Sequence, residues 1–112
     1  MKLVIAVIKP FKLEEVTDAL IKLGVHGMTV AEVRGFGRQK GHAQGQPGDE
    51  YLVNLVPKTR VEVACAEGDA GRVVAMIEAA AKTGTVGDGK IFVLDLETAL
   101  RIRTGETGNS AL

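Results

Sequence analysis

A run of six apolar residues at positions 3–8, Leu-Val-Ile-Ala-Val-Ile, limits the possible folds more than any other feature of the chain. The run has no polar alternation and stops at Lys9-Pro10, so it predicts a β-strand that must be covered on both faces. Residues 91–94 are apolar on both faces in the same way. Hydrophobic residues make up 46% of the chain and aromatic residues only 4%, which favours sheets and helices packed through aliphatic side chains.

Hydrophobic spacing predicts two helices and further strands along the chain. Leu13, Val16, Leu20 and Leu23 recur at helical intervals, and Gly24 is a natural stop. The predicted elements are a strand over 3–8, a helix over 13–23, a strand over 28–35, a long strand over 51–66 interrupted at 58–59, a helix from an N-cap at 69 to a stop at 84, a strand over 90–96, and a short strand in the tail 101–108.

The order β-α-β-β-α-β predicts an α+β fold of the ferredoxin-like kind, in a single domain over residues 1–112. Two helices cover only one face of such a four-stranded sheet. The strands at 3–8 and 90–96 would leave apolar side chains on the other face, so we expect the chain to self-associate through it. Residues 35–50, rich in glycine, form a loop too long for an ordinary hairpin turn, and loops of this length are usually functional or disordered.

Composition excludes several classes of protein. Lys plus Arg and Asp plus Glu number 14 each, so no global charge draws the protein to nucleic acid or membrane. Cys65 is the only cysteine, which rules out an intramolecular disulfide and is typical of a small core residue. The apolar N-terminal run is too short to span a membrane, and we expect a cytoplasmic protein.

Residues 84–90, Gly-Thr-Val-Gly-Asp-Gly-Lys, match the first seven positions of a P-loop. The match fails at Ile91, where Ser or Thr should hold magnesium, and the segment runs from helix to strand instead of strand to helix. Its glycines and Lys90 still suit an anion, although a plain connector explains the segment equally well. Arg101 and Arg103 would point the same way in an extended segment and could bind a polyphosphate, with a solvated charge pair as the alternative.

Other signals for chemistry are weak. Arg34-Gly35-Phe36-Gly37 imitates the start of an RNA-binding motif, but the motif does not continue and the chain has too few aromatic residues for base stacking. Direct binding of nucleic acid is therefore not expected. His26 and His42 have no partner at zinc-binding spacing, and no nucleophile with its base is evident.

Taken together, several long motifs resemble the PII family of nitrogen-regulatory signal-transduction proteins. They lie at residues 8–13, 24–30, 35–42, 83–92 and 101–108, and the resemblance covers essentially the whole chain. It implies a homotrimer with ATP or ADP bound in the clefts between subunits. The residues implied to bind the nucleotide are Thr29, Gly37, Arg38, Glu62, Ala64, Gly87, Asp88, Gly89, Lys90, Arg101 and Arg103.

The resemblance also implies a second ligand. Gln39 would help to hold Mg²⁺, and Lys58 would pair with a carboxylate of 2-oxoglutarate once ATP is bound. Residues of about 36–55 correspond to the T-loop, which engages target proteins in the family, and about 101–112 to a C-terminal loop. Tyr51 stands at the usual uridylylation position and implies a uridylylating enzyme as a partner. Gln46 and Asp49 depart from the tyrosine and serine found there in other members.

The implied function is regulatory and not enzymatic. The protein would sense ATP, ADP and 2-oxoglutarate and act on an ammonium transporter, another transporter, or an enzyme or regulator of nitrogen metabolism. A transporter partner would recruit it to the inner face of the membrane. A slow ATPase is one alternative function, and regulation of a transport system outside ammonium uptake is another.

Overall fold

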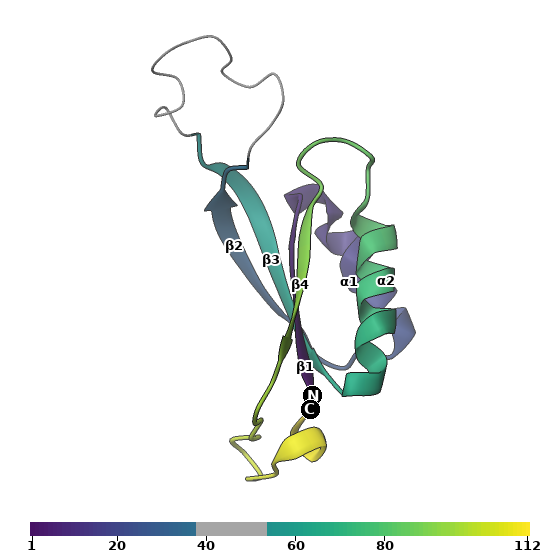
Figure 1. Ribbon diagram of the computed structural model, residues 1–112, viewed down its shortest axis with the longest axis vertical. Coiled ribbons are helices and arrows are strands. Elements are labelled where there is room, and N and C mark those ends of the chain that lie inside the picture. The colour runs from purple at the N-terminus through teal and green to yellow at the C-terminus, as the bar shows by residue number, and fades with distance from the viewer. Residues whose placement is uncertain (38–53) are drawn as a thin grey trace.

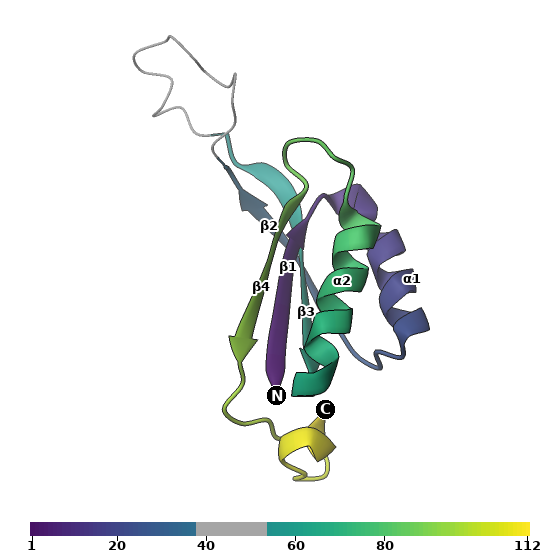
Figure 2. The same ribbon diagram turned by 45° about the vertical axis from the view of Figure 1, so that its right-hand side comes forward.

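The computed structural model describes residues 1–37 and 54–112, which form an antiparallel four-stranded sheet and two α-helices. The elements are β1 (Lys2–Ile8), α1 (Leu13–Leu23), β2 (Thr29–Gly35), β3 (Val56–Cys65), α2 (Ala70–Ala81) and β4 (Gly89–Asp95). The strand order is β2-β3-β1-β4, so β1 and β3 are central. Both helices lie on the same side of the sheet (Figure 1, Figure 2). The predicted α+β, ferredoxin-like fold is confirmed.

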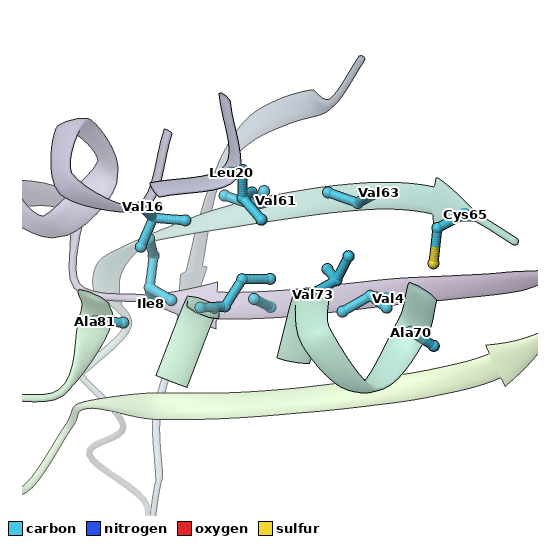
Figure 3. Packing of buried hydrophobic residues seen from close by; sticks show 12 residues of the cluster. Val4, Ile8, Val16, Leu20, Val61, Val63, Cys65, Ala70, Val73 and Ala81 are labelled. Carbon is cyan, nitrogen blue, oxygen red and sulfur yellow. The ribbon is translucent and has the colours of Figure 1, made fainter. Parts of the chain in front are cut away.

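The core lies between the helices and the sheet. Alternate residues of β1 are fully buried because they face the helices, whereas the residues between them are only partly covered. Figure 3 shows how side chains of the two helices meet those of β1 and β3. The largest fully buried side chains are Val4, Ile8, Val16, Leu20, Val61, Val63, Val73 and Ile77.

The other face of the sheet is open in the single chain. By strand alternation it carries Leu3, Ile5 and Val7 of β1, paired with Leu94, Phe92 and Lys90 of β4. Phe92 and Leu94 are 49% and 46% exposed, which leaves a large apolar area in water. The apolar open face is therefore present, and the self-association that would cover it stays a prediction.

β3 differs from the prediction of an interrupted strand. It runs without a break from Val56 to Cys65, and Thr59 is buried in its middle. Thr59 pairs with Ile8 on one side and with Glu32 on the other. Because two neighbouring strands satisfy its backbone, a polar residue at this position does not interrupt the strand. Residues 51–53 of the predicted strand lie outside the described residues.

The helix ends are partly as expected. Gly24 follows α1 in the left-handed conformation, with φ of +101°, which glycine adopts without strain. α2 ends at Ala81 and not at Gly84, because the next free backbone N–H, that of Thr83, bonds to the carboxylate of Asp88. Asp69 precedes α2 as expected, but its side chain makes no capping bond and pairs with Arg72.

The tail after β4 folds into turns. An isolated bridge between Leu100 and Thr107 is its only strand-like pairing in the described residues, and Gly108–Ala111 form a short 3-10 helix. The expected short strand is thus reduced to a single bridge. No helix within residues 1–37 and 54–112 is long and apolar enough to cross a bilayer.

Candidate ligand-binding site

The glycine-rich segment that connects α2 to β4 is a folded turn organised by one carboxylate. Asp88 Oδ2 accepts hydrogen bonds from the backbone N–H groups of Thr83 and Gly84, both at 2.8 Å. The Thr83 hydroxyl donates to Asp88 Oδ1. These hydrogen bonds hold the pKa of Asp88 well below its usual range. The bond from the Thr83 side chain has the largest effect, and Lys9 lowers the pKa further. The carboxylate is therefore ionised and already occupied by the turn itself.

Lys9 holds the same turn from the end of β1. Its Nζ donates to Thr85 Oγ1 at 2.6 Å and to Thr83 Oγ1 at 3.0 Å, and it lies 3.2 Å from Asp88 Oδ1. The side chains of Lys9 and Asp88 are only 18% and 24% exposed. Lys9 is not recognisable as a site residue from the sequence, because nothing in the sequence brings position 9 next to position 85.

The turn meets the sheet at Gly87 and Gly89. Lys58 Nζ, on β3, donates a hydrogen bond to the carbonyl oxygen of Gly87 at 2.8 Å. A Cβ atom at position 87 would stand 3.5 Å from that Nζ. Gly89 opens β4 by pairing with Ile8. Lys90 follows on the open face and is exposed, so an anion at this turn could reach two lysines, Lys58 and Lys90.

The other residues of the sheet that are predicted to bind the nucleotide are Thr29, Glu62 and Ala64. They lie farther along the sheet, away from the glycine-rich turn. Thr29 of β2 pairs directly with Glu62 of β3, and Ala64 stands two residues beyond on the same face. All three line an open pocket of about 830 Å³, which the tail also borders through Ala99 and Leu112. The structure therefore brings Thr29, Glu62 and Ala64 together, in a pocket that the glycine-rich turn does not line.

The tail after β4, which carries Arg101 and Arg103, lies at the opposite end of the sheet from the turn (Figure 1, Figure 2). The seven residues of β4 separate the two regions, which corresponds to about 20 Å. The expectation of an extended segment is wrong, because residues 102–104 form a turn in which the Gly105 N–H bonds to the Arg101 carbonyl. The Arg101 guanidinium donates to the Leu112 backbone oxygen at 3.0 Å. Within one chain, neither arginine reaches the glycine-rich turn.

Several predicted site residues are not placed. Arg38, Gln39 and Tyr51 lie outside the described residues, and Gly37 is the last residue described before them. Gln39 is the expected contact for Mg²⁺, so the structure does not test that site. In the two described segments, no group of three or more His, Cys, Asp or Glu side chains could hold a metal ion.

The fold and the turn define an α+β domain of the ferredoxin-like class with a preformed glycine-rich turn beside Lys9, Lys58 and Lys90. A family model described as nitrogen regulatory protein P-II matches residues 1–106. The chain is 54% identical, over the full length of both chains, to nitrogen regulatory protein P-II of Rhizobium etli and to nitrogen regulatory protein GlnK of Escherichia coli K12. It is 50% identical, again over both full lengths, to the P-II protein of Rhodospirillum rubrum. The chain therefore belongs to the P-II nitrogen regulatory protein family, as its motifs predicted.

Proposed function

We propose that this protein is a regulatory sensor that binds ATP or ADP at the glycine-rich turn, with 2-oxoglutarate as a second ligand. The observation that carries the proposal is the hydrogen bond from Lys58 to Gly87. It joins the turn to β3, the strand that directly follows the T-loop segment of about 36–55. A ligand that changes this contact can therefore change the start of β3 and the loop attached to it.

The turn has the chemistry that a polyphosphate requires. Glycines at 84, 87 and 89 leave the backbone without side chains, and Lys58 and Lys90 supply positive charge beside it. Gly87, Gly89 and Lys90 would contact the phosphates, and the backbone of Asp88 would join them. Arg38 would close the site from the T-loop segment, together with Gly37.

The distance between the turn and the two arginines supports a site shared between subunits. β4 separates Arg101 and Arg103 from the turn in their own chain, by about one strand length, so only another copy could bring them to the same phosphates. Thr29, Glu62 and Ala64 would contact the nucleoside. A homotrimer assembled through the open apolar face would supply both the second copy and the cover for Phe92 and Leu94.

A regulatory role fits the turn better than hydrolysis. The relatives are named as regulatory proteins. Asp88 is the only acidic residue of residues 82–90, and it is held by Thr83, Gly84 and Lys9, so it is not free to activate water. The targets would be an ammonium transporter, another transporter, or a nitrogen-metabolism enzyme or regulator, engaged through the T-loop. Tyr51 would be the site at which a uridylylating enzyme modifies the protein.

Calorimetric titration with ATP tests the proposal. Lys90→Ala and Arg103→Ala should each weaken ATP binding while the protein stays folded, because both side chains are exposed and outside the core. A lost charge-assisted contact is worth roughly 1.5–3 kcal/mol, which is about tenfold or more in affinity. Lys82→Ala, an exposed lysine that precedes the turn, is the matched control. Unchanged affinity in both site variants would contradict the proposed nucleotide site.

A further inference from the structure

We propose that Lys9 is a positioning residue for the nucleotide site, which acts through Thr83, Thr85 and Asp88 and does not touch the ligand. The inference rests on the proposed function, because it takes residues 84–90 as the segment that receives the phosphates. It adds Lys9, which lies outside that segment, as a residue on which the affinity for phosphate would depend.

The three donors of the Lys9 ammonium group are already used. An ammonium group has three N–H bonds. They match the three oxygen atoms around Nζ, namely Thr85 Oγ1 at 2.6 Å, Thr83 Oγ1 at 3.0 Å and Asp88 Oδ1 at 3.2 Å. The side chain is also mostly buried, at 18% exposure. No N–H donor remains for a hydrogen bond to phosphate, so Lys9 does not bind the ligand directly.

The hydroxyl groups complete a closed network. The Thr83 hydroxyl donates to Asp88, so it must accept from Lys9 and from the Thr85 hydroxyl, which lies 2.7 Å away. Asp88 Oδ2 meanwhile holds the Thr83 and Gly84 N–H groups. Lys9 thus bonds to residues near both ends of the turn, and it fixes the start of the turn, at Thr83, relative to its last residue before β4, Asp88.

Such a network would reduce the entropy that the turn loses when a ligand binds. Gly84 and Gly87 allow the unrestrained segment many backbone conformations. A turn already held in one shape loses less entropy when its N–H donors are ordered around an anion. Loss of the Lys9 ammonium should therefore weaken phosphate binding although no contact to phosphate is removed.

A direct electrostatic effect makes the opposite prediction for Asp88. If Lys9 acted by its charge alone, removing the negative charge of Asp88 would leave the site more positive and tighten ATP. If Lys9 acts by position, Asp88→Asn breaks the same network and weakens ATP despite the gain in positive charge. The sign of the change at Asp88 therefore separates the two explanations.

The test measures ATP affinity by calorimetry at fixed ionic strength. Its control variant removes the same charge as Lys9→Met. Lys9→Met and Asp88→Asn should each weaken ATP about three- to tenfold, and the double variant should lose little more than either single one. Lys9→Arg should recover part of the loss. Lys12→Met removes the same charge from a lysine paired with Glu15 outside the turn, and it should bind ATP like the unmodified protein.

Amide hydrogen exchange in the ligand-free protein gives a readout that does not depend on ATP. Lys9→Met should exchange faster at Thr83 and Gly84, with α1 unchanged. If Lys9→Met fails to fold, Thr85→Val removes one of the three acceptors and should show both effects more weakly. Unchanged ATP affinity in Lys9→Met, or tighter ATP in Asp88→Asn, would overturn the inference. Absence of ATP binding by the unmodified protein would instead contradict the proposed function, and the exchange rates would still show whether Lys9 orders the turn.

Discussion

Gly89 lies so close to Val7 that a Cβ atom at position 89 would stand 1.7 Å from the Val7 carbonyl oxygen. Gly89 also has a φ of +109°, in the region that L side chains rarely adopt. The contact occurs where the turn becomes β4 and pairs with the end of β1. The requirement for glycine at this position therefore comes from packing in the single chain, before any ligand is considered.

Replacement of Gly89 by alanine should strongly destabilise the protein. The backbone of β1 or β4 would have to move, because the Val7 carbonyl cannot rotate away as a flexible side chain could. We expect a loss of more than about 2 kcal/mol, seen as a lower thermal unfolding midpoint. Gly71→Ala in α2 is the control. Beyond its chain neighbours and the backbone of its own helix, no atom would lie within 4 Å of a Cβ atom at position 71, and this variant should be neutral or stabilise slightly. Equal midpoints for the two variants would contradict the packing argument.

Phe92→Asp should break self-association. Phe92 lies on the open face of β4 and is 49% exposed in the single chain, so an assembly through this face would bury its ring. A carboxylate buried there without a partner is strongly unfavourable. Light scattering at micromolar concentration should give the mass of a trimer for the unmodified protein and a smaller mass for the variant. Ile21→Asp, on the outer surface of α1 with 62% exposure, should remain a trimer. A folded monomer of the unmodified protein would contradict the proposed trimer.

Asp88 should contribute to stability in a pH-dependent way. Its pKa is depressed in the folded protein, chiefly by hydrogen bonds from Thr83, whereas an unfolded aspartate titrates near about 3.9. The stabilisation is therefore fully present above about pH 5, well above the unfolded pKa, and is lost as the pH falls toward the folded pKa. Denaturant unfolding between about pH 6 and pH 2.5 should show a steeper loss of stability for the unmodified protein than for Asp88→Asn. Asp18→Asn, on the exposed surface of α1, should follow the unmodified protein.

The sheet and helices could be predicted from sequence because their signals are local. Leu13, Val16 and Leu20 repeat along one helix face, and α1 begins and ends where this spacing and Gly24 predict. The run at 3–8 became β1 with one residue added. Thr59 was misleading because its burial depends on two strands that are distant in sequence.

The candidate site was less predictable because its contacts are not local. The glycine-rich segment and Lys90 were recognisable by composition, but Lys9 bonds to side chains 74 and 76 residues away. Arg101 and Arg103 were expected side by side on a strand, and the bridge between Leu100 and Thr107 folds their segment into a turn instead. Two side chains that are two residues apart point to the same face only if the backbone between them is extended.

The contact between Lys58 and Gly87 leads to a prediction about the coupling of two ligands. 2-Oxoglutarate is a dianion, so beside ATP it would be repelled unless a cation bridges the two. Mg²⁺ held by ATP and Gln39 would form that bridge, and Lys58 would pair with the distal carboxylate. In the structure Lys58 donates to the uncharged carbonyl of Gly87, and exchange for a carboxylate would give a stronger, charge-assisted bond. Binding of 2-oxoglutarate should therefore release Gly87 and alter the start of β3 beside the T-loop.

Titration of 2-oxoglutarate into the ligand-free, Mg-ADP and Mg-ATP forms measures this coupling. Binding should require Mg-ATP, and 2-oxoglutarate should tighten ATP by the same factor by which ATP tightens 2-oxoglutarate, because coupling is reciprocal. Gln39→Ala and Lys58→Ala should each lose 2-oxoglutarate binding. Lys58→Ala should keep much of its ATP affinity, since Lys90 remains at the turn. Lys22→Ala, on the exposed surface of α1, serves as the charge control. Equal affinity for 2-oxoglutarate in all three forms, or unchanged affinity in both site variants, would leave a nucleotide sensor that does not respond to 2-oxoglutarate.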